Sequence, residues 1–266
     1  MRSLREILLS ARAMPSGDFG WDGTRGGFAS IAFLTKEHFK RIMRIQLLKH
    51  LYYWLHERFS KDATKGRYSS GFWQDAVRDK ALALCAQARG SLLEVGSGEG
   101  LFLIQLAGKN QGLKLWGIDN SKARVQEAQE EVTREKLAYI TFSEADAANL
   151  PFEDNYFDIV VCINVLFNLP SWDYVKKVLF EMTRVCKRQG RVVFEFRNSL
   201  NPLIVCKYAL ARYYDETVKT LPLRPYRFSQ LMRLAKECGL DIVKGYAIGF
   251  FFRPLAPIIM VEAVKK

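Results

Sequence analysis

The stretch that decides the fold lies at residues 92–100 and reads Leu92-Leu93-Glu94-Val95-Gly96-Ser97-Gly98-Glu99-Gly100. An apolar strand, interrupted only by a glutamate, runs into a turn of three glycines, and a helical pattern follows. Glycines are needed in such a turn because side chains would keep a ligand away from the backbone. The stretch therefore predicts a strand, a ligand-binding turn and a helix.

Outward from this stretch, helical and strand patterns alternate from residue 71 onward, as a parallel sheet with crossover helices requires. One boundary rests on a local signal: Lys187 and Arg188 are expected to close a helix before a glycine stop at Gly190. Residues 198–227 are irregular, with a short helix at 204–214 as one interpretation. Strands are expected at 91–95, 114–119, 139–145, 157–163, 191–196, 241–248 and 257–264, and helices at 73–88, 100–108, 122–136, 171–188 and 229–238.

Two acidic residues follow the glycine turn at the ends of successive expected strands. Asp119 lies 21 residues after Gly98, where a carboxylate can accept both hydroxyls of an adenosine ribose. A helix cap is the alternative role for Asp119. Asp146 can accept a hydrogen bond from an exocyclic amine while the Ala147 amide reaches a ring nitrogen, and a plain turn residue is the alternative. The early third glycine at Gly100 departs from the dinucleotide fingerprint and disfavours a pyrophosphate cofactor.

Together these residues resemble the class I S-adenosylmethionine (AdoMet)-dependent methyltransferases of the small-molecule type. Residues 94–100 are similar to the first motif of that family, E/D-x-G-x-G-x-G, and residues 117–121 to its second. Residues 149–160, Asn-Leu-Pro-Phe through Phe-Asp-Ile-Val, are similar to its approach to the fourth strand. The resemblance implies an α/β, Rossmann-like, doubly wound sheet of seven strands with an antiparallel last strand. It also implies AdoMet as cofactor and S-adenosylhomocysteine as product.

The resemblance assigns the cofactor contacts residue by residue. The loop backbone at Gly96, Ser97 and Gly98 would hold the amino-acid end of AdoMet, with Glu94 at its base. Further contacts would come from the ribose side, the adenine side and the end of the fourth strand. These are Asp119 and Asn120, Asp146 and Ala147, and Asn164, which would face the sulfonium or the acceptor.

The sequence assigns no single catalytic residue. Methyl transfer is an in-line displacement, so a general base is needed only for a weakly acidic hydroxyl or a protonated amine. The candidates are Glu195 and Asn198, at the end of the fifth strand, and His56 in an N-terminal helix. Glu195 and Arg197 share one face of their strand, so an ion pair between them is the alternative.

The acceptor is expected to be a small molecule, a lipid, a quinone-like ring or a glycan, methylated on an O or C atom. Residues 198–227 are rich in tyrosine and arginine and fall where this family inserts its substrate cap. The chain lacks the Asn/Asp-Pro-Pro-Tyr/Phe motif of enzymes that methylate amino groups of nucleic acids and of glutamine, which counts against methylation of a base nitrogen and makes nucleic acid an unlikely partner. Two alternatives stay open. One is an RNA methyltransferase, which rests only on the net charge of +12, and the other is a non-catalytic AdoMet-binding partner subunit.

The N-terminal part is expected to be separate from the catalytic domain. Residues 1–66 read as a linker and an amphipathic helical extension, and residues 67–266 as the methyltransferase domain. Apolar residues recur every four positions from Phe39 to Phe59, with basic residues elsewhere. This helix is expected to pack on its own domain or a partner, with an anionic membrane surface as the alternative.

The leading segment is too short for a signal peptide, which predicts a cytoplasmic protein, with peripheral membrane attachment as the alternative. Five separated cysteines without a CxxC pair predict neither a disulfide framework nor a metal site. The oligomeric state is not predicted.

Overall fold

The computed structural model describes residues 71–266, apart from 138, 215–220 and 250–251. The N-terminal extension, its amphipathic helix and the boundary expected at residue 66 lie outside the described residues.

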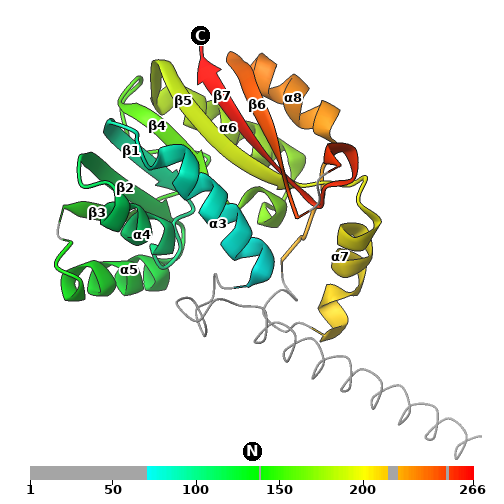
Figure 1. Ribbon diagram of the computed structural model, residues 1–266, viewed down its shortest axis with the longest axis horizontal. Coiled ribbons are helices and arrows are strands. Elements are labelled where there is room, and N and C mark those ends of the chain that lie inside the picture. Colours follow the sequence, from blue (N-terminus) through cyan, green and yellow to red (C-terminus); the bar gives the residue numbers. More distant parts are fainter. Residues whose placement is uncertain (1–70, 138, 215–220, 250–251) are drawn as a thin grey trace, which may run out of the picture. The chain divides into compact units, whose positions relative to one another are not determined.

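Seven strands form one sheet in the order β3-β2-β1-β4-β5-β7-β6 (Figure 1). The first five strands run parallel, whereas β7 is antiparallel to both β5 and β6. The expected Rossmann-like seven-stranded sheet with an antiparallel last strand is therefore confirmed. The strands are β1 (Gly90–Val95), β2 (Leu113–Asp119), β3 (Ile140–Glu144), β4 (Phe157–Cys162), β5 (Cys186–Arg197), β6 (Leu240–Ile248) and β7 (Ile258–Lys265).

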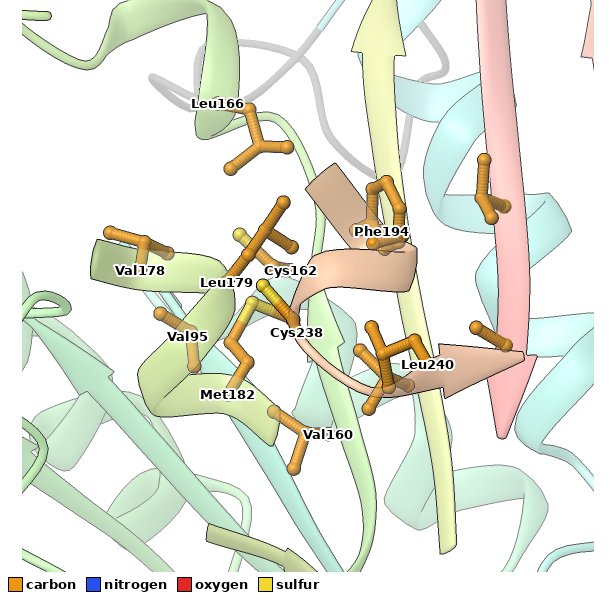
Figure 2. Close-up of a cluster of buried hydrophobic side chains, with 14 of the residues drawn as sticks. Val95, Val160, Cys162, Leu166, Val178, Leu179, Met182, Phe194, Cys238 and Leu240 are labelled. Carbon is orange, nitrogen blue, oxygen red and sulfur yellow. The ribbon is translucent and has the colours of Figure 1, made fainter. Parts of the chain in front are cut away.

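Helices cover both faces of this sheet because its central strands are apolar on both sides. In β4, Val160 and Cys162 face the core under α6 and α8, whereas Ile159 and Val161 face the core under α3, α4 and α5. Figure 2 shows the first core, where Met182 of α6 packs beside Val160. The helices are α3 (Phe72–Cys85), α4 (Leu101–Lys109), α5 (Lys122–Arg134), α6 (Trp172–Val185), α7 (Pro202–Tyr214) and α8 (Phe228–Glu237), with short 3-10 helices η2 (Leu166–Asn168) and η4 (Arg253–Leu255).

The boundary between α6 and β5 was wrongly predicted. The helix ends at Val185 and the strand begins at Cys186, so Lys187 lies on β5 and its Nζ donates to Asp158 Oδ1 at 2.8 Å. Gly190 is not a helix stop. A Cβ there would lie 2.8 Å from Cys186 Sγ and 3.0 Å from the Asp158 carbonyl oxygen. Close packing of β5 against β4 therefore explains why residue 190 is a glycine, although Lys187, Arg188 and Gly190 resemble a helix terminus.

None of the helices in the described part of the chain is both long enough and apolar enough to cross a bilayer. All five cysteines are free thiols, and Cys206 on α7 is the one that is exposed.

Candidate cofactor and acceptor site

A cavity of about 270 Å³ opens at the carboxyl ends of β1, β2 and β4. The order of strands reverses between β1 and β4, which is where open α/β sheets bind ligands. Eight of the nine expected cofactor residues line this cavity, and Asp146 does not. The eight are Glu94, Gly96, Ser97, Gly98, Asp119, Asn120, Ala147 and Asn164.

The three glycines of the turn all have positive φ, at 77°, 53° and 77° for Gly96, Gly98 and Gly100. A Cβ on Gly96 would lie 2.3 Å from Val165 Cγ2, and one on Gly100 would lie 2.7 Å from Phe142 Cζ. A Cβ on Gly98 would meet no atom within 4 Å. Packing of the protein itself therefore requires two of the glycines, whereas the third borders open space in the cavity.

Asp119 ties this turn to the end of β2. Its Oδ2 accepts a hydrogen bond from the Gly98 amide at 2.9 Å, and its Oδ1 accepts one from the Ser121 amide at 2.9 Å. The N-cap residue of α5 is Ser121. Each carboxylate oxygen has two lone pairs, so each retains an acceptor site for a ligand hydroxyl.

On the side of the cavity formed by β1 and the glycine turn, two buried oxygens lack a partner among the described residues, Glu94 Oε2 and Ser97 Oγ. Burial raises the pKa of Glu94 well above its usual range, although the Arg78 guanidinium opposes the shift and the Asp119 carboxylate adds to it. A buried polar atom without a hydrogen bond is costly. Both oxygens are therefore positions where a ligand would supply the missing partner.

At the end of β4, a buried ion pair holds Asn164 in a left-handed conformation with φ of 60°. Its amide donates to Glu195 Oε1 at 2.8 Å, and its side-chain Oδ1 accepts from Arg197 Nη2 at 2.8 Å. Glu195 Oε2 and Arg197 Nη1 lie 3.6 Å apart, with side chains 0% and 3% exposed. The ion pair between Glu195 and Arg197, which was an alternative in the sequence analysis, therefore forms behind Asn164. Because Asn164 Oδ1 already accepts from Arg197, its Nδ2 hydrogens are the groups that can donate to a ligand in the cavity.

The remaining expected residues lie elsewhere. Asp146 is exposed and accepts hydrogen bonds from the Tyr174 hydroxyl and, at 2.8 Å, from the Ala148 amide. The hydrogen bond from Tyr174, and to a smaller extent the one from the Ala148 amide, lowers the pKa of Asp146. The buried Asn198 amide donates to the carbonyls of residues 254 and 256 and accepts from the amide of residue 200, so it secures loop backbone. His56 lies outside the described residues.

Five polar side chains in the cavity wall were not predicted from the sequence. Arg78 and Asp75 form a buried ion pair of 2.6 Å on α3. The sequence did contain a sign that Arg78 is buried, because it lies at helical spacing from Leu82 and Cys85, on the apolar face of that helix. The five are Arg78, Ser121, Arg124, Asn168 and Tyr174.

Comparison with known proteins agrees with this geometry. Residues 93–194 match the family described as "Methyltransferase domain". A phosphatidylethanolamine N-methyltransferase of Cereibacter sphaeroides is 32% identical over 149 residues, which cover 55% of this chain and 70% of the relative. A ubiquinone/menaquinone C-methyltransferase of Francisella tularensis subsp. novicida is 40% identical over 100 residues, but the match covers only 36% of that protein.

Solved structures show the same fold. The magnesium protoporphyrin IX methyltransferase of Synechocystis, crystallised with S-adenosylhomocysteine, has a TM-score of 0.57 at 21% identity over 74% of this chain and 88% of that chain. The YcgJ protein of Bacillus has a TM-score of 0.55 at 16% identity over 71% of this chain and 99% of that chain. This chain belongs to the class I AdoMet-dependent methyltransferases. It is thus an AdoMet-dependent enzyme, and the question that follows is which acceptor it methylates.

Proposed function

We propose that this enzyme methylates the polar end of a lipid-class acceptor, such as a phospholipid or an isoprenoid quinone. The observation that carries the proposal is the cavity wall beyond β4, where Val165, Leu169 and Leu221 are apolar. Two amides interrupt this wall, Asn164 and Asn168, and Asn168 Oδ1 is buried without a partner among the described residues. Apolar walls with few polar groups suit a ligand with one polar end. Both relatives described above are named for lipid-class acceptors.

For the cofactor, we propose that Glu94 Oε2 and Ser97 Oγ receive the amino-acid end of AdoMet beside the open space at Gly98. Asp119, next to Asn120, would accept the ribose hydroxyls. Toward the adenine, the Ala147 amide would donate and the Asp146 carboxylate, which retains free lone pairs, would accept. When bound, AdoMet supplies an electrophilic methyl group on its sulfonium.

The described residues of the site position the acceptor, and the proton that an amine or hydroxyl acceptor must lose would go to solvent. Among the described residues that line the cavity, the carboxylates are Glu94 and Asp119, both on the proposed cofactor side. Burial and the bond to Asp146 raise the pKa of Tyr174 to about 12, so its hydroxyl stays protonated at neutral pH. Asn164 and Asn168 can fix the polar end in line with the methyl group, which is the main requirement of a displacement. His56 as a base stays a prediction.

Replacing Gly98 with alanine tests the cofactor placement. We expect the dissociation constant for AdoMet to rise at least tenfold, because the new methyl group would occupy space where the cofactor backbone approaches. The fold should survive, since the Cβ meets no protein atom and the left-handed conformation costs only about 1–2 kcal/mol. The measurement is calorimetric titration with AdoMet beside thermal unfolding.

Gly239→Ala is the matched control for this substitution. Gly239 has φ of 84°, its Cβ would also meet nothing within 4 Å, and it does not line the cavity. The two variants should lose similar stability, while only Gly98→Ala should lose affinity. Equal AdoMet affinity in both would contradict the placement of the cofactor at Gly98.

The acceptor class is tested by methyl transfer from labelled AdoMet. We expect label in the lipid extract when the full chain is incubated with phosphatidylethanolamine vesicles or with a demethylated quinone in micelles. Soluble glycans, catechols and RNA serve as competing acceptors. Mass analysis of the product identifies the methylated atom. The sequence predicts an O or C atom, whereas the relative from Cereibacter sphaeroides is named an N-methyltransferase. Label confined to a water-soluble acceptor would overturn the proposal.

A further inference from the structure

Tyr174, on the first turn of α6, connects the cavity wall to the carboxylate that is expected to contact adenine. Its hydroxyl donates a hydrogen bond to Asp146 Oδ1, and its side chain lines the cavity. Asp146 does not line the cavity, but its sequence neighbours Ala145 and Ala147 do. The carboxylate therefore lies at the rim of the cavity, within reach of the Tyr174 hydroxyl.

The hydrogen bonds at Asp146 leave one carboxylate oxygen available to a ligand. Oδ1 accepts from the Tyr174 hydroxyl and, at 2.8 Å, from the Ala148 amide, so both of its lone pairs are used. Oδ2 accepts no hydrogen bond from the residues that the structure describes. The Ala148 bond holds the side chain to its own turn, which the Asn149 amide closes by donating to the Asp146 carbonyl at 3.0 Å. Tyr174 adds the second bond, and the two together determine that Oδ2 stays available.

The backbone of Tyr174 is itself held in place. Ser171, the N-cap residue of α6, accepts a hydrogen bond from the Tyr174 amide at its Oγ, at 3.1 Å. Val175 is completely buried, and the ring of Trp172 packs against that of Tyr226 with centroids 5.7 Å apart. A hydroxyl on so constrained a turn can hold a carboxylate in one orientation.

Other hydrogen bonds already attach the loop between β3 and β4 to α6. The Leu150 amide donates to Glu181 Oε2 at 2.7 Å, and the Arg184 guanidinium donates to the Leu150 carbonyl at 3.0 Å. Arg184 also donates to the carbonyl of residue 152 at 2.8 Å. The Tyr174 hydroxyl is therefore not needed to fasten this loop, and its bond to Asp146 acts on the orientation of the carboxylate.

We propose that Tyr174 is a positioning residue for the cofactor, because it holds Asp146 so that Oδ2 accepts from the exocyclic amine of adenine. This inference rests on the adenine contact of Asp146 proposed above, and it adds the side chain that makes the site selective for the base. A carboxylate can only accept hydrogen bonds. A base without the amine would therefore leave the oriented carboxylate without its partner.

The probes are S-adenosylhomocysteine and its deamino analogue, in which hydrogen replaces the exocyclic amine and the ring nitrogens are unchanged. Calorimetric titration of the full chain gives the ratio of the two dissociation constants. We expect the wild-type protein to bind S-adenosylhomocysteine at least about tenfold more tightly, which is the effect of one hydrogen bond to a charged group. Tyr174→Phe keeps the ring and removes the hydroxyl. It should lower this ratio at least about threefold, because the ligand must then order the carboxylate itself.

Tyr246→Phe is the matched control. The Tyr246 hydroxyl also donates to a carboxylate, Glu262 Oε2 at 2.8 Å, but neither residue lines the cavity. This variant should keep the wild-type ratio. Asp146→Ala should bring the ratio close to one, and Tyr174→Phe added to Asp146→Ala should change it no further, because the tyrosine acts through the carboxylate. Thermal unfolding of each variant verifies that it is folded.

The possible failures are distinguishable. If Asp146→Ala lowers the ratio but Tyr174→Phe leaves it unchanged or raises it, the positioning role is refuted and the adenine contact stands. A ratio that Asp146→Ala does not alter, or a wild-type protein that does not discriminate, would refute the adenine contact and the positioning role with it. A further fall when Tyr174→Phe is added to Asp146→Ala would show that the hydroxyl acts on the base directly, which would also overturn the inference.

Discussion

Replacing Asp119 with alanine is expected to raise the dissociation constant for AdoMet by about 100-fold or more. Hydrogen bonds to a charged group contribute about 1.5–3 kcal/mol each, and the carboxylate has one free acceptor site on each oxygen for the two ribose hydroxyls. The substitution also removes the hydrogen bond of 2.9 Å that the Gly98 amide donates to Asp119 Oδ2. The glycine turn would then lose its tie to β2. Calorimetric titration with AdoMet and with S-adenosylhomocysteine measures both effects.

Glu144→Ala is the control for Asp119→Ala. Glu144 pairs directly with Asp119 across β2 and β3, ends its strand at the same edge of the sheet, and does not line the cavity. Its removal takes away the same charge at nearly the same place and should leave AdoMet affinity within about twofold, because exposed charges act weakly through water. If Asp119→Ala bound AdoMet as tightly as Glu144→Ala, the ribose would have to lie elsewhere.

Replacing Arg197 with methionine is expected to lower the free energy of unfolding by about 3–5 kcal/mol, because it leaves Glu195 as an uncompensated buried carboxylate. Burial already raises the pKa of Glu195 even with Arg197 present. For a domain of this size each kcal/mol is worth about 2–4 °C in the midpoint of thermal unfolding. The midpoint should therefore fall by about 6–20 °C, and calorimetric scanning measures it.

Arg191→Met is the matched control on the same strand. Arg191 pairs with Glu262 at 3.1 Å, but its side chain is 31% exposed, so the loss should be about 1 kcal/mol or less. Glu195→Gln combined with Arg197→Met should recover much of the lost stability, since both buried charges are then gone while an oxygen remains to accept from the Asn164 amide. Equal losses in Arg197→Met and Arg191→Met would refute this account of the buried pair.

Local sequence patterns were sufficient for most of the catalytic domain. The ends of β1 and β2 fall within one residue of their predicted positions, because alternating or continuous apolar runs bounded by turns identify strands. The glycine turn was equally readable, since a left-handed backbone at three alternate positions, 96, 98 and 100, favours glycine. The boundary between α6 and β5 was predicted wrongly because the local pattern was misleading. Cations before a glycine resemble a helix end, and only the pairing of Cys186 with Phe157 shows a strand.

The amino-acid sequence by itself determined the order of strands and helices, the glycine turn and the carboxylate 21 residues later, because these features follow from local backbone geometry and from spacing along the chain. The tertiary structure alone decided what the polar groups do. It placed Glu195 against Arg197 and Asn164, and it left Leu203 and Leu210 of α7 exposed while burying Ile204 and Ala211. Burial and partner choice depend on residues distant in sequence, which the pattern of a single segment does not contain.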